Sequence, residues 1–161
     1  MVHKLTGLWL LAALICACAA PAATGPAIQI EAAWARPAAV AEMDGMAMGT
    51  AMPGMGGGAT SAVHLTIRND GGQADRLTGV SCIAAEHASV HETRVEQGVA
   101  KMMPVDSLEI PARGKVEFKP GGYHVMLEGL KQDLKVGDSV QVILQFEKSG
   151  AVTVNAAVRQ P

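Results

Sequence analysis

The chain has 161 residues, of which 49% are hydrophobic and 17% are charged, and its formal net charge is −2. This charge argues against nucleic acid as a partner, because no basic patch is available to neutralise phosphates. Aromatic residues make up 3% of the chain, whereas methionine occurs nine times and is unevenly placed.

Residues 1–23 have the features of a secretory signal peptide: a basic start at Lys4, an apolar stretch and small residues near the end. Two cleavage sites stay open. One follows an alanine around Ala20 to Ala23, and the other precedes Cys18, which stands in a lipobox-like setting and would carry a lipid anchor. We therefore expect export to the periplasm, either as a soluble protein or as a membrane-anchored lipoprotein. Cys82 is then the one ordinary thiol, so no intramolecular disulfide is expected.

Residues 24–161 are expected to form a single domain of strands and turns. Alternating apolar residues, typical of strands with one buried face, recur between turns rich in Gly, Pro, Asn and Asp. The expected strands are residues 28–35, 62–67, 76–82, 89–95, 99–103, 115–119, 122–128, 139–147 and 152–158. About eight or nine short strands predict an all-β antiparallel sandwich or barrel.

Residues 42–58 interrupt this pattern with methionines set among Gly, Ala and Pro. The stretch has neither a strand period nor a helix period, so we expect a loop between the first two strands. Methionine as simple filler is one interpretation, but such a density of thioethers favours a cluster that captures soft copper. The predicted secondary donors are Met43, Met46, Met48, Met52 and Met55.

A separate set of residues has the types and spacing of a soft-metal site: His91, Met102, His124 and Met126. In a strand, side chains at i and i+2 share one face, so His124 and Met126 project together, away from the apolar face of the same segment. Imidazole beside thioether suits monovalent copper(I), whereas zinc prefers Cys, His and carboxylate. The sequence therefore predicts a copper(I) site.

Each of these residues also has a plainer interpretation, because a lone His on a strand is usually exposed or hydrogen-bonded and a lone Met usually fills the core. Met102 and Met103 must face opposite ways on a strand, and the register assigns Met102 to the metal site and Met103 to the core. His64 lies between apolar residues and is expected to have a structural role. His87 is expected in a solvated turn at residues 84–87.

Two other classes of function lack the residues that they need. A blue-copper electron-transfer site requires a Cys ligand, and Cys82 is not in a Cys-x-His or Cys-x-x-x-His setting. No arrangement of nucleophile, base and oxyanion donors is visible, and no phosphate loop, so the chain is not expected to be an enzyme.

The spacing of the four candidate ligands resembles the periplasmic copper chaperone family PCu(A)C, whose His, Met, His-x-Met motif is matched without gaps. The surrounding sequence is also similar to that family at Trp34–Arg36, Val90–Thr93, Lys101–Val105, Leu108–Ala112 and Lys119–Leu127. The resemblance covers roughly Ile28 to Val158 and implies a cupredoxin-like β-sandwich. Two features depart from the family: the loop at Met43–Met55 is longer than its usual short connection, and His64 stands where an aromatic residue is expected.

The resemblance implies an extracytoplasmic chaperone that captures copper(I) and delivers it to a cuproenzyme. The expected recipient is the dinuclear copper centre of cytochrome c oxidase, in subunit II, with a Sco-type protein as a further partner. The alternative is a sequestration protein that stores copper for tolerance without delivering it. A third interpretation is a plain β-sandwich interaction module in which the His and Met residues are incidental.

Overall fold

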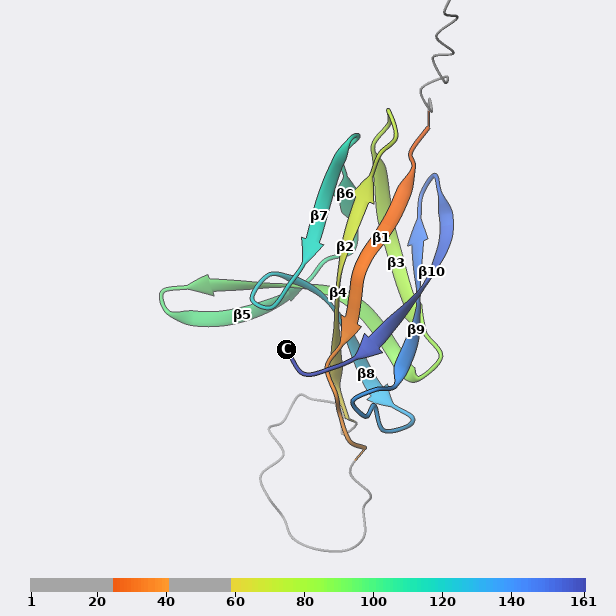
Figure 1. Ribbon diagram of the computed structural model, residues 1–161. Coiled ribbons are helices and arrows are strands. Elements are labelled where there is room, and N and C mark those ends of the chain that lie inside the picture. The colour runs from red at the N-terminus through yellow and green to blue at the C-terminus, as the bar shows by residue number, and fades with distance from the viewer. Residues whose placement is uncertain (1–24, 41–58) are drawn as a thin grey trace, which may run out of the picture.

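The computed structural model describes residues 25–40 and 59–161, and its secondary structure there is a succession of strands (Figure 1). The strands are β1 (Ile28–Ala35), β2 (Ser61–Asn69), β3 (Asp75–Cys82), β4 (Ala85–Glu96), β5 (Val99–Pro104), β6 (Leu108–Ile110), β7 (Gly114–Phe118), β8 (Tyr123–Leu130), β9 (Ser139–Phe146) and β10 (Gly150–Val158). The predicted class, an all-β single domain, is confirmed. In the described part of the chain, no helix has the length and apolar character needed to cross a membrane.

The strands follow the order β5-β4-β8-β7-β2-β1-β10-β9-β3-β6, with an additional pairing of β8 with β2. Most neighbours run antiparallel, as expected, but β1 with β10 and β7 with β8 pair in parallel. The sequence analysis expected antiparallel neighbours throughout. Alternation of apolar residues identifies a strand but does not give its direction relative to its neighbours, so these two parallel pairings could not be predicted. It also missed β6, whose three residues are too few to show a period.

The sheet curls over itself, so that β3 packs against β4 although the two strands are not hydrogen-bonded neighbours. Side chains from both halves meet in one core. Val63 of β2, Val125 and Leu127 of β8, and Val142 of β9 are fully buried there. Burial of each such side chain contributes about 1.5–3 kcal/mol. Because Val125 and Leu127 face the core, Met126 between them and His124 before them face the other way.

A β-bulge in β1 redirects one aromatic side chain. Before the bulge Ile30 lies opposite Ile67, and after it Trp34 lies opposite His64, a shift of one residue. Ala32 sits in the bulge with a φ of 51°, a left-handed conformation that is uncommon for residues other than glycine. Without the extra residue Trp34 would share the core face with Ile30. The bulge therefore turns Trp34 to the face opposite the core.

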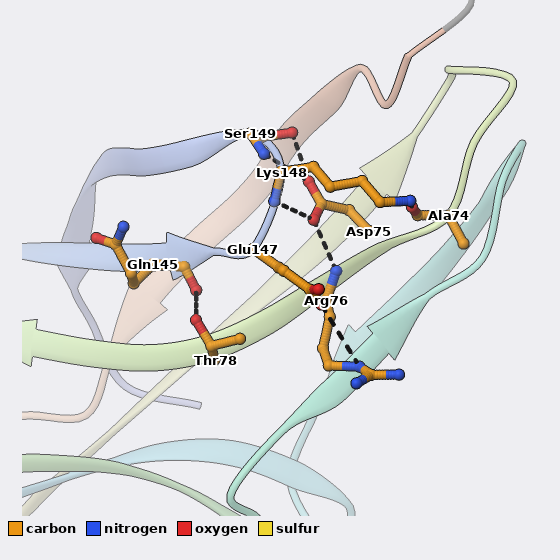
Figure 2. Close-up of polar contacts among 8 residues, drawn as sticks. All are labelled: Ala74, Asp75, Arg76, Thr78, Gln145, Glu147, Lys148 and Ser149. Atoms are coloured by element: carbon orange, nitrogen blue, oxygen red, sulfur yellow. Dashed lines mark hydrogen bonds and ion pairs between the residues drawn. The ribbon is translucent and has the colours of Figure 1, made fainter.

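A network around Asp75 ties the start of β3 to the β9–β10 turn (Figure 2). The Asp75 carboxylate accepts hydrogen bonds from the backbone amides of Lys148 and Ser149, both at 2.9 Å, and from the Ser149 hydroxyl. Burial alone would raise the pKa of Asp75, but these bonds, with one from the Arg76 amide, outweigh it and lower that pKa. The network lies on strands other than those that carry the candidate ligands.

Two local predictions are wrong. His87 lies within β4 instead of a turn, although it is exposed as expected. Met103 does face away from Met102, but it is 40% exposed on a strand whose residues are all exposed, so it is not a core residue. The predicted signal peptide, the lipid site at Cys18 and the Met-rich loop lie outside the described residues.

Candidate metal centre

The strand register brings all four predicted ligands to one face of β5, β4 and β8. His91 of β4 lies directly opposite His124 of β8. Two residues further along β4, Thr93 lies opposite Met102 of β5. Met126 shares the face of His124 because side chains alternate along a strand. The i, i+2 argument made from the sequence therefore agrees with the register of three separate strands.

A cavity of about 550 Å³ opens on this face, and Met102, His124 and Met126 line it. His91 does not line the cavity, but its ring centroid lies 6.0 Å from that of His124, which does. Trp34 and Arg36 form part of the opposite wall. The cavity lies where the chain crosses from β7 to β8, so its rim includes backbone of that connection.

The donors differ widely in exposure. His124 is 6% exposed and Met126 is half-buried, whereas Met102 is 51% exposed. A metal ion bound here would have a dry inner wall of β8 side chains and a thioether on the outer side that solvent reaches. This asymmetry distinguishes the cavity from a closed structural metal site, in which all ligands are buried.

A hydrogen bond involves one ring nitrogen of each of the two imidazoles, His91 and His124. His124 Nδ1 lies 3.2 Å from the Gly122 carbonyl oxygen, so with a proton on Nδ1 the ring donates to that carbonyl and keeps the Nε2 lone pair free. His91 Nε2 lies 3.1 Å from the Ser89 hydroxyl, while its Nδ1 is buried with no hydrogen-bond partner among the described residues. Each ring thus has one anchored and one unused nitrogen.

A third imidazole, His64, lines the same cavity. Its ring centroid is 4.5 Å from that of Trp34 and 6.4 Å from that of His124. Burial, the neighbouring His124 and Arg36 lower the pKa of His64 to about 4, so its ring is neutral at physiological pH. The sequence predicted only a structural role for His64, although it contained a further signal. Val63 and Leu65 lie on the core face of β2, so His64 between them must face the opposite side, where the cavity lies.

The donor chemistry fits copper(I). In residues 25–40 and 59–161, no three His, Cys, Asp or Glu side chains converge as they would around zinc or a hard cation. What converges instead is a pair of thioethers with imidazoles, and thioether is a ligand of soft ions. Thioether does not ionise, so Met102 and Met126 need lose no proton to bind a metal ion.

Comparison with known proteins identifies the family of this chain. Residues 28–158 match the family model "LpqE-like: Putative lipoprotein LpqE-like". The chain is 30% identical over 137 residues to the putative lipoprotein Lxx21020 of Leifsonia xyli subsp. xyli, a match that covers 84% of this chain and 81% of that protein. It is 34% identical over 99 residues to the uncharacterised protein RP573 of Rickettsia prowazekii, of which the match covers 55%.

Among solved structures, the copper-bound PCuAC domain from PmoF2 is 27% identical, with a TM-score of 0.58 over 83% of this chain and 93% of that one. The solution structure of CuI-DR1885 from Deinococcus radiodurans is 28% identical, with a TM-score of 0.54 over 81% of this chain and 78% of that one. The likeness to PCuAC domains expected from the sequence is confirmed. With the family model covering nearly all of the described residues, the chain belongs to the LpqE-like family of putative lipoproteins, with the fold of the PCuAC domains.

Proposed function

We propose that the protein is an extracytoplasmic copper(I) carrier that binds one ion between β5, β4 and β8 and passes it to a cuproenzyme. The observation that carries this proposal is the convergence of His91, Met102, His124 and Met126 on one face, beside an open cavity. The copper-bound PCuAC domain from PmoF2 and CuI-DR1885 share this fold at 27% and 28% identity. The function is binding and transfer, with no catalytic step.

Delivery is favoured over storage by the exposure of one donor. A ligand that is 51% exposed, as Met102 is, can be replaced by a donor of an incoming protein before the buried donors release the ion. A storage site has no such need, and burial of all donors would serve it better. We propose the dinuclear copper centre of cytochrome c oxidase subunit II as the recipient, with a Sco-type protein as a further partner.

Copper(I) titration tests the binding step. The reduced protein is titrated against a chromogenic copper(I) chelator without oxygen, with zinc as competitor. We expect one ion at the described site and a preference for copper(I) over zinc of orders of magnitude, because thioether is a poor zinc ligand. Equal competition by zinc would remove the basis of the site.

A deletion strain tests the fate of the copper. Loss of oxidase activity when copper is scarce, restored by added copper, is the result expected of a delivery protein. Sensitivity to excess copper with normal oxidase activity would instead support the storage alternative. Mass spectrometry of the mature protein decides between a lipid anchor at Cys18 and a free N-terminus after an alanine around Ala20 to Ala23.

A further inference from the structure

Exposed apolar side chains gather on the hairpin of β4 and β5. Of the six large hydrophobic residues that are exposed in residues 25–40 and 59–161, four belong to these two strands: Val95, Val99, Met102 and Met103. Val95 is the most exposed of the four, at 69%. Apolar groups that cluster on a surface are typical of interaction sites. Copper binding as proposed above uses Met102 alone, so it does not account for the other three.

The strand register divides this hairpin into two faces of different character. Directly paired residues share a face, and the face alternates from one residue to the next. One face carries Thr93 opposite Met102 and Val95 opposite Ala100, with no charged side chain. The other face carries the charged residues of the hairpin, which form two ion pairs: Glu92 with Arg94, and Glu96 with Lys101. Because Thr93 and Met102 line the cavity, the uncharged face continues outward from the metal site.

The opposite wall of the cavity carries positive charge. Arg36 lines the cavity, and the Arg159 guanidinium lies 4.9 Å from the ring centroid of Trp34, which also lines it. Both arginines are exposed. Neither forms an ion pair in the part of the chain that the structure describes. Two uncompensated positive charges therefore lie on one side of the metal site, and an uncharged apolar face lies on the other.

We propose that these two surfaces dock the protein that receives the copper, and that this recipient presents an apolar patch to the hairpin and carboxylates to Arg36 and Arg159. The inference rests on the copper transfer proposed above. A recipient held in this way covers Met102, the most exposed donor, and can bring its own donor to the ion there. Complementary charge fixes its orientation and speeds the encounter. A lipid surface fits less well, because it would cover Met102 without offering a donor.

A pair of hairpin variants tests the apolar side. Copper(I) transfer from the loaded protein to the copper-free soluble domain of cytochrome c oxidase subunit II is followed by stopped-flow absorbance without oxygen. Val95→Asp should lower the transfer rate by about tenfold or more, because it places a carboxylate where the recipient is apolar. Val99→Asp is the matched control, since Val99 is 58% exposed on the other face of the same hairpin. Neither residue lines the cavity, so both variants should keep the wild-type copper(I) affinity in chelator competition.

A second pair of variants tests the positive side. Arg159→Glu should lower the transfer rate by about tenfold at low salt, and added salt should reduce this difference because it screens exposed charges. Lys131→Glu makes the same change in net charge directly after β8, at the end of that strand far from His124, and should have little effect. The wild-type transfer rate should itself fall as salt is added, a measurement that does not depend on how any variant folds.

Equal transfer rates in Val95→Asp and Val99→Asp would overturn the proposal, as would equal rates in Arg159→Glu and Lys131→Glu. Absence of transfer to subunit II from copper(I)-loaded wild type would overturn it too. Binding to phosphatidylglycerol vesicles that Val95→Asp and Arg159→Glu abolish, with unchanged transfer rates, would assign the surface to a membrane instead. Copper(I) binding by wild type separates all these outcomes from failure of the proposed function, which requires that binding to be absent.

Discussion

The inner wall of the cavity and the β4–β5 hairpin contribute to the same site but have opposite physical character. On the inner wall, His124 and Met126 alternate with Val125 and Leu127, which are fully buried in the core. The hairpin projects away from the other strands (Figure 1) and carries Met102 among exposed residues. One half of the site is therefore fixed by core packing, and the other is held by a strand ladder alone.

Little beyond that ladder stabilises the hairpin. β5 is the first strand in the sheet order and pairs with β4 only. The ion pairs Arg94–Glu92 and Lys101–Glu96, at 2.7 Å and 2.9 Å, lie on the surface, where such pairs contribute about 0–1 kcal/mol. Elements with few buried contacts open at low free-energy cost. For the proposed copper site, this contrast predicts that copper affinity depends mainly on the inner wall and copper exchange mainly on the hairpin.

The largest effect is expected on the inner wall. Met126→Ala should lower the copper(I) affinity by at least about 100-fold, more than the loss of an outer-shell partner of a ligand, because it removes a donor held in place by β8. Chelator competition measures the affinity. Because Met126 faces the cavity instead of the core, the thermal unfolding midpoint should change little.

Unchanged copper affinity together with a lost melting transition would show that Met126 belongs to the core. The fully buried neighbour Leu127 provides the matched contrast. Leu127→Ala should lower the free energy of unfolding by about 2–5 kcal/mol while leaving the donor set intact.

A smaller equilibrium effect is expected on the hairpin. Met102→Ala should lower the copper(I) affinity by about tenfold, since an exposed donor on an edge strand is less preorganised than one in the inner wall. Stopped-flow absorbance measures the rate of copper(I) transfer to an acceptor chelator. Relative to the loss of affinity, this rate should change more in Met102→Ala than in Met126→Ala. Met103→Ala is the control, because Met103 is similarly exposed but faces the other way. An equal loss of affinity in both variants would show that the two thioethers are interchangeable and that the β4–β5 register does not decide which methionine binds copper.

Residue spacing along a single strand was enough to place two of the four candidate ligands on one face. The i, i+2 relation of His124 and Met126 depends only on strand geometry, and the turn at Gln97–Gly98, with φ values of 51° and 80°, was visible from its sequence. The pairing of His91 with His124 could not be derived in this way. It depends on the register between β4 and β8, which only the structure gives.

The features that the sequence did not reveal depend on contacts between distant segments. The bulge at Ala32 has no glycine to mark it, so the turn of Trp34 toward the cavity was not predictable from β1 alone. The change of partner of β2 from β8 to β7 places His64 at an opening, whereas its own strand shows only a polar residue between two apolar ones. Register and partner exchange are tertiary properties, and single-strand patterns do not encode them.

His64, which lines the cavity, should make the free energy of unfolding depend on pH, an effect of intermediate size. Its folded-state pKa of about 4 lies below the ordinary 6.5, so between these values the unfolded chain binds the proton that the folded protein excludes. The metal-free protein should therefore lose stability as the pH falls from 6.5 to 4, with a slope from this group of at most about 1.4 kcal/mol per pH unit. His64→Phe should remove this component from urea unfolding curves. The exposed His87→Phe should retain it, and identical slopes in all three proteins would show that His64 is not buried as described.

The smallest effect is expected at the far end of the hairpin. Val99 is 58% exposed at the start of β5, directly after the turn, and lies opposite Glu96 instead of a core residue. Val99→Thr keeps the branched shape that suits a strand and removes only exposed apolar surface. The free energy of unfolding should change by no more than about 0.5 kcal/mol, and copper(I) affinity should be unaffected. Urea unfolding and chelator competition measure the two quantities. A loss of more than about 1.5 kcal/mol would mean that the hairpin is packed against the rest of the protein in solution, and the contrast between a fixed inner wall and a weakly held hairpin would then fail.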